Sequence, residues 1–436
     1  MDYALKSGSL RGTDNLRWLL LVLPIYFFIV TAWFIRPLSV NNISLAYAAP
    51  LTFVTGLLLL NVPRSEVLAM LLRARFELAL ALLMSLLSIL SVINSSEPIR
   101  ILRILFPSML PILLVVQLIA LRSISPESVE RLPRHFLMAG FAFACLPLFL
   151  SFISSGIDNY TFGEGYRFMG MFDHEAQLSV MVAVMVPLII GEIAISERPI
   201  IRWMWIVSLI VVFYTSVRVG SKTALFISVG YASVFYIIAH ARFQSFLKNV
   251  FLVSVVFVLM VFLGIYGLSI ATAIDPIFGA KIAAIFNQGV ENYATIESRS
   301  VLWREAWDQG TRHWLIGTGA GEPILGSSHA HNLILDYFRG IGIFGALAIA
   351  LLCGCILWRT MRKTFDVIRA ETVSPLDIRI LACFSAATIY VLCNQLSNSF
   401  GPATISALWM IYLPAVLSEP MKPSASGTSW SASHVG

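Results

Sequence analysis

The chain of 436 residues is far more apolar than a soluble protein, because 58% of its residues are hydrophobic and only 12% are charged. Soluble domains have about 25% charged residues. The composition therefore excludes a soluble globular protein and indicates a protein that crosses a membrane several times.

Continuous apolar runs of about twenty residues, the length that spans a bilayer as a helix, recur along the chain. A closed barrel of strands would instead show alternation over segments of about ten residues. The sequence predicts an all-α polytopic membrane protein with about twelve transmembrane helices. The expected spans are roughly 16–35, 43–62, 76–93, 104–121, 136–154, 177–195, 200–217, 223–240, 250–270, 341–358, 379–396 and 402–418.

These spans divide the chain into four parts. Residues 1–270 hold the first nine helices, 271–340 form one long polar loop expected to contain short helices, 341–420 hold the last three helices, and 421–436 are a Ser-rich tail expected to be disordered. The polar residues 1–15 precede an apolar stretch that has no small-residue cleavage site before the next loop, which predicts a retained first helix. Basic residues fall mostly on one side, so both termini are expected in the cytoplasm and the loop on the outer face.

Several basic residues are expected on the outer face, where the positive-inside rule disfavours them. Arg218 and Lys222 lie four residues apart after the seventh span, close enough on a helix to bind one diphosphate. Snorkelling to lipid headgroups is the alternative. Arg167 precedes the sixth span, where Asp173 and Glu175 are interpreted as helix caps. A weaker outer pair is Arg100 and Arg103.

The long loop supplies the next candidates. A helix opened by Glu297 places Arg299, Trp303 and either Ala306 or Trp307 on one stripe, as in a helix at the membrane surface with its arginine directed into a cavity. The two tryptophans are interpreted as interfacial packing. The loop is not basic overall, which argues against binding to an anionic polymer such as nucleic acid.

Two histidines follow, in the segment His329-Ala330-His331-Asn332 just before the tenth span. A metal site is disfavoured because neither a cysteine nor a clear third ligand lies nearby. A histidine at the membrane edge can act as general base for an alcohol. Chemistry alone does not rank the two imidazoles, and Asn332 is expected to cap or anchor the loop.

A glycine cluster at 317, 319 and 321 superficially resembles a phosphate-binding loop but lacks the Lys-Ser/Thr that follows in such loops, so a turn is expected. The five cysteines lie in apolar runs and are interpreted as small core residues.

The order and spacing of these segments resemble the O-antigen ligase and polymerase family of bacterial membrane glycosyltransferases. The resemblance covers about 165–345 and the twelve-span layout, which suits a GT-C-like fold. Its features are Ser298-Arg299 with Trp303, Gly317-x-Gly319, His331-Asn332, Gly340-x-Gly342-x-x-Gly345 and, upstream, Arg167-Phe168-x-Gly170-x-Phe172.

The resemblance implies a metal-independent, inverting transfer of a glycan from undecaprenyl diphosphate to an acceptor hydroxyl at the periplasmic face of the bacterial inner membrane, without a cofactor. The family's essential histidine maps to His331 and its loop arginine to Arg299. Its earlier arginine maps either to Lys222, in matching surroundings, or to Arg218, which keeps the residue type.

In a ligase the acceptor is a sugar of the lipid A core, and a single dominant outer loop favours a ligase. A polymerase or a protein O-oligosaccharyltransferase would share the motifs and differ in acceptor. A lipid-linked-oligosaccharide flippase is the rival from another class, and it should carry charged residues along its spans.

Overall fold

In the residues that the computed structural model describes, the regular elements are helices, joined by turns, and there is no strand. These residues are 64–96, 102–124, 126–151, 175–219, 227, 230, 273, 294–325, 330–370, 372–396 and 402–419. The predicted spans 16–35, 43–62 and 250–270, almost all of 223–240, the first fifteen residues and the tail 421–436 lie outside them.

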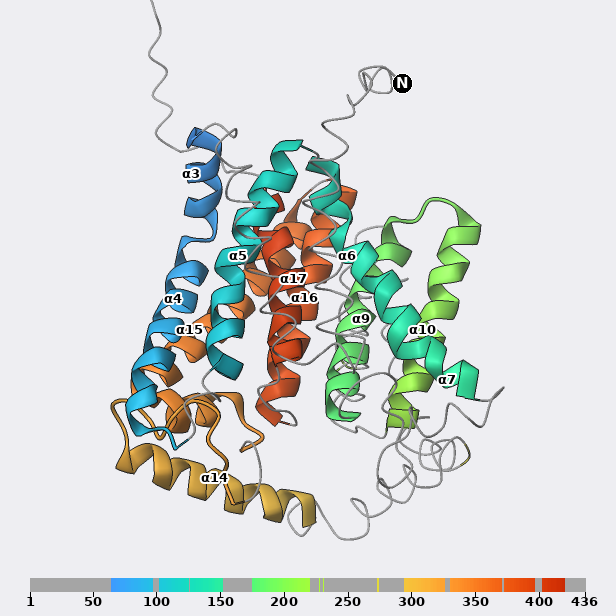
Figure 1. Cartoon of the computed structure of the whole chain (residues 1–436). Helices are drawn as coiled ribbons and strands as arrows, with labels where there is room; N and C mark the ends of the chain where they lie inside the picture. The colour runs from blue at the N-terminus through green and yellow to red at the C-terminus, as the bar shows by residue number, and fades with distance from the viewer. Residues whose placement is uncertain are drawn as a thin grey trace, which may run out of the picture.

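Figure 1 shows the helices of the described residues. They are α3 (Arg64–Arg73), α4 (Arg75–Leu90), η2 (Ser91–Asn94), α5 (Leu102–Ile124), α6 (Pro126–Gly140), η4 (Phe141–Cys145), α7 (Leu146–Ser151), α9 (Glu175–Ile195), α10 (Pro199–Val219), α14 (Ala294–Arg312), α15 (Leu333–Arg369), α16 (Pro375–Leu396) and α17 (Pro402–Ser418).

Five helical stretches in the described ranges are long and apolar enough to cross a membrane, which confirms the prediction of a helical protein fit for a membrane. Each of them overlaps a predicted span, and the number of about twelve stays a prediction. The five are Arg75–Asn94, Leu178–Ile195, Pro199–Val219, Leu333–Arg369 and Pro375–Gln395.

Helices α9 and α10 are both apolar on all sides, but α9 is central in the bundle and α10 is peripheral. Helix α9 packs against both α10 and α16 and is buried along almost its whole length. Helix α10 buries few residues and exposes Ile200, Trp203 and Met204. An apolar outer surface of this kind suits contact with lipid tails. Helix α16 also packs against α15 and α17, α15 packs against α4, and α17 packs against α5 and α6.

Helix α14 lies across one end of the bundle, and α3 stands at the opposite end (Figure 1). We call these the α14 end and the α3 end. At the α14 end, Gly310 lies so close to α15 that an added Cβ would be 2.5 Å from the Phe338 ring. The exposed Trp307 packs against Phe338, with the two rings tilted by 45° and 5.3 Å between their centroids. Helix α14 is therefore held tightly against the start of α15.

At the α3 end, a buried ion-pair network joins α4, α15 and α17. The fully buried Glu77 carboxylate accepts hydrogen bonds from Arg359 Nε at 2.8 Å and from the Tyr412 hydroxyl at 2.9 Å. Arg359 Nη1 also donates to Glu419 at 2.9 Å. Arg73 donates to the backbone oxygens at the end of α17. Charges in an apolar bundle need such partners, because a lone buried charge is costly.

One predicted helix boundary is wrong, because α14 begins at Ala294 and not at Glu297. The predicted tenth span, 341–358, lies within α15, and its start falls at the non-helical residues Ile341 and Gly342 that divide α15 into a short first part and a long second part. The short part directly follows Asn332, so the candidate histidine His331 stands just before a helix.

Candidate functional site

Helix α15 is broken near its start, and a turn of the preceding loop fills the break. Ile341 and Gly342 have non-helical backbone angles, with φ of 80° at Gly342. The turn donates from Thr318 N to Arg339 O at 2.7 Å and from Gly319 N to Gly340 O at 3.1 Å. Ile343 N donates to Trp314 O at 2.8 Å. These bonds satisfy backbone groups that the break removes from the helix ladder.

The glycines of the sequence motif permit this backbone-to-backbone contact. A Cβ at Gly317 would lie 2.4 Å from the backbone of Gly340, and one at Gly342 would lie 2.2 Å from Leu315 O. Both residues have φ near +80°, a region that glycine enters without steric cost. The glycine cluster is thus a turn, as expected, and it serves to dock the loop on α15.

His331 stands between this turn and the helix, in a strained conformation. Its φ is 56°, in the left-handed region that non-glycine residues seldom adopt. The next residue, Asn332, caps α15 by accepting from Leu335 N at 3.0 Å, which confirms the predicted capping role. Asn332 Nδ2 also donates to Gln395 O at 3.4 Å, so the cap is tied to α16.

A buried carboxylate, that of Asp336, holds the residue before His331. Asp336, in the first turn of α15, accepts from Ala330 N at 2.7 Å, and its own N–H donates to Asn332 O at 2.9 Å. Arg339 lies 3.7 Å from the same carboxylate, and both side chains are almost completely buried. The residues on both sides of His331 are therefore held by hydrogen bonds, which sustains the strained conformation between them.

The loop before His331 packs on α14 through a small apolar cluster. Ala306, Ile324 and Ala330 are completely buried there, and Trp303 packs against them. Trp307 is exposed, so the predicted stripe of α14 that faces the protein runs through Ala306 and not through Trp307. Arg299 lies one helical turn before Trp303 and is half-buried. The cluster thus brings the elements that carry Arg299 and His331 together.

Of the other predicted residues, the structure describes Arg218 and Arg103. Arg218 is half-buried in the last turn of α10, whose final residues lie at the α14 end (Figure 1). Arg103 lies in the first turn of α5. Glu175 begins α9. The candidates Arg167, Lys222, His329 and Arg100 lie outside the described residues.

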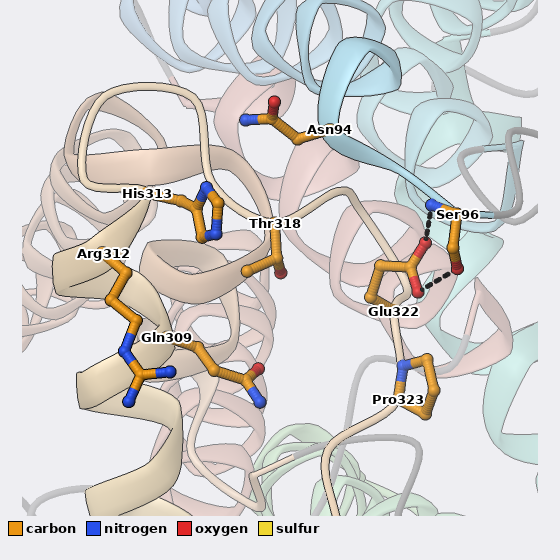
Figure 2. Close-up of a pocket in the computed structure, with 8 residues that line it drawn as sticks. All are labelled: Asn94, Ser96, Gln309, Arg312, His313, Thr318, Glu322 and Pro323. Carbon is orange, nitrogen blue, oxygen red and sulfur yellow. Dashed lines mark hydrogen bonds between the residues drawn. The ribbon is translucent and has the colours of Figure 1, made fainter.

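A polar pocket of about 300 Å³ opens beside the turn, and none of the predicted site residues lines it (Figure 2). Its walls come from η2, the C-terminal end of α14 and the turn itself. No sequence motif marks it, since its parts are far apart in the chain. The lining residues are Asn94, Ser96, Gln309, Arg312, His313, Thr318, Glu322 and Pro323.

Within the described ranges, no three His, Cys, Asp or Glu side chains gather in a group that could hold a metal ion. No protein-family model matches the chain, and no curated protein is detectably similar to it in sequence. The fold defines an α-helical protein with several helices fit to cross a membrane and a loop helix across one end.

Proposed function

We propose that the protein is a membrane glycosyltransferase, and specifically an O-antigen ligase. It transfers a glycan from undecaprenyl diphosphate to a sugar hydroxyl of the lipid A core, at the periplasmic face of the bacterial inner membrane. The observation that carries the proposal is the shared cluster of Trp303, Ala306 and Ala330, which brings the helix of Arg299 to the loop of His331. The resemblance assigns the essential histidine and the loop arginine of the family to these two positions.

The reaction needs positive charge at the donor diphosphate. In the proposed mechanism Arg299 and Arg218, with Lys222 and Arg167, bind the diphosphate through charge-assisted hydrogen bonds. As the bond between the anomeric carbon and the phosphate oxygen breaks, these cations stabilise the charge that develops on the leaving undecaprenyl diphosphate. They supply the role that a divalent cation has in other transferases, so the mechanism needs no metal.

His331 acts on the acceptor. Its imidazole accepts the proton of the acceptor hydroxyl while that oxygen attacks the anomeric carbon from the face opposite the leaving group, which inverts the configuration. The left-handed backbone of His331 supports this role, because strained residues that the surroundings hold in place concentrate at active sites. Asn332 and Asp336 hold the adjoining residues and position the imidazole.

Purified protein supplied with lipid-linked glycan and lipid A core tests the proposal. Replacing His331 by Ala should slow transfer by about a hundredfold or more, and Arg299→Ala should do so by a similar factor. Arg304→Ala is the matched control, because Arg304 lies on the exposed face of the same helix and should keep the wild-type rate. Wild-type rates in both site variants, or complete loss of activity with a chelator, would contradict the mechanism.

The acceptor that becomes modified distinguishes the ligase from its relatives. Lipid A core, a peptide and a second donor molecule are offered in the same reaction. Transfer to the peptide or to the second donor would replace the ligase assignment by an oligosaccharyltransferase or a polymerase. Movement of intact donor across the bilayer without transfer would instead identify a flippase.

A further inference from the structure

The pocket beside the turn is built from rigid parts. Glu322 accepts from Ser95 Oγ and Ser96 N at 2.7 Å each and from Ser96 Oγ at 2.8 Å, which fixes the turn to the end of η2. Asn94 Nδ2 donates to Gly317 O at 2.8 Å in the same junction. The Thr318 hydroxyl donates a hydrogen bond to Arg339 O at 3.2 Å. A site with walls fixed in this way loses little conformational entropy when a ligand binds.

The pocket walls carry both hydrogen-bond donors and acceptors. Arg312 at the end of α14 and His313 just after it line the pocket, and the amide of Gln309 stands opposite the carboxylate of Glu322 (Figure 2). A phosphate is a strong acceptor that favours a lining of donors and is repelled by a carboxylate. Sugar hydroxyls both donate and accept, so they match this mixed lining.

Size and position agree with a sugar. The volume of about 300 Å³ is at the small end of ligand pockets, which suits one or two rings. Gln309 follows Arg299 by ten residues on α14, a distance of about 15 Å along the helix axis. The pocket is therefore on the same helix as the proposed diphosphate site but separate from it.

We propose that this pocket is a saccharide-binding subsite, which holds a sugar unit of one of the two glycan substrates away from the reacting atoms. The inference rests on the proposed function for the identity of these substrates. The glycan of the donor and the core oligosaccharide of the acceptor share the hydroxyl chemistry that the pocket recognises, and experiment distinguishes them.

Direct binding is measured first, by calorimetry on the detergent-solubilised full chain. The two probes are the core oligosaccharide freed of lipid A and the glycan released from the donor. One of them should bind, and the double variant Gln309→Ala/Arg312→Ala should weaken that binding about tenfold, as expected for lost polar contacts. Arg304→Ala is the matched control, since it removes an exposed arginine of α14 outside the pocket, and it should bind like wild type.

The same double variant is then assayed for transfer. The Michaelis constant for the substrate whose glycan binds should rise about tenfold with little change in kcat, because the pocket lies away from the reacting atoms. Failure of both oligosaccharides to bind, equal binding by wild type and double variant, or a fall in kcat alone would overturn the subsite. A third outcome separates the two proposals. If wild-type protein binds a glycan through the pocket but transfers none, the proposed function is contradicted and the subsite is retained.

Discussion

The α3 end and the α14 end of the bundle are stabilised by different groups. At the α3 end, charged side chains of α3, α4 and α15 and Glu419, just after α17, pair with one another and with backbone oxygens around the buried Glu77. At the α14 end, the turn meets α15 through backbone hydrogen bonds that close-packed glycines permit. Ion pairs hold the first end together, whereas backbone contacts, with the Asn94 and Glu322 side chains, hold the second.

This difference bears on where chemistry can take place. At the α3 end, Arg359 binds Glu77, Glu419 and the backbone of Arg73, so its donors are committed to the fold. At the α14 end, backbone contacts and the Asn94 and Glu322 side chains fix the turn, and Arg312 beside the pocket is not part of that junction. A rigid backbone with side chains directed to a substrate is the arrangement that a binding site needs.

The largest effect is expected from breaking the network at the α3 end. Arg359→Ala leaves the fully buried Glu77 without its cation and should lower the free energy of unfolding by about 3–5 kcal/mol. Thermal unfolding in mild detergent measures it. The control is Arg362→Ala, whose partner Asp366 is 4.0 Å away with both side chains half exposed, and the change there should be below about 1 kcal/mol. Equal shifts in the two variants would show that the network does not hold the α3 end.

A smaller loss is expected from adding one methyl group at the α14 end. Gly342→Ala places a Cβ 2.2 Å from Leu315 O in a residue with positive φ, and it should cost about 2–3 kcal/mol and reduce glycan transfer. In contrast, Gly354→Ala in the same helix meets nothing within 4 Å and should stabilise the protein by about 0.5–1 kcal/mol. Thermal unfolding of both variants measures the two changes in stability. A loss in Gly342→Ala beside a gain in Gly354→Ala would show that docking of the turn on α15 stabilises the protein, and changes of the same sign would contradict it.

The smallest effect concerns the strained backbone of the candidate histidine. Glycine enters the left-handed region freely, so His331→Gly should be more stable than His331→Ala by about 1 kcal/mol. Neither variant should transfer glycan. Chemical denaturation of the pair measures the difference, and a less stable glycine variant would show that the left-handed backbone carries no strain.

Sequence patterns predicted the parts of the fold that depend on local composition. The long apolar runs of α9 and α10 and the cap of Asn332 each follow from neighbouring residues, as does the packing of Trp303 towards the protein. The choice between Ala306 and Trp307 was left open, because one residue turns a helix by about 100° and both positions fit the stripe. Packing against Ile324 and Ala330 settles it.

Contacts between distant segments were beyond sequence patterns. The break at Gly342 depends on a turn some twenty residues earlier, and no local signal distinguishes it from the other glycines of α15. The polar pocket joins residues near 95, 310 and 320, each of which is ordinary in its own surroundings. The pairing of Glu77 with Arg359 likewise links positions 282 residues apart.

The bonds between η2 and the turn also have a consequence for biosynthesis. Asn94 and its acceptor Gly317 are separated by 223 residues, so the ribosome makes one half of the junction long before the other. Until Gly317 and Glu322 have been synthesised, Asn94, Ser95 and Ser96 at the end of η2 lack the hydrogen-bond partners that they have in the folded protein. The α14 end is therefore assembled late, after most of the membrane helices have been synthesised.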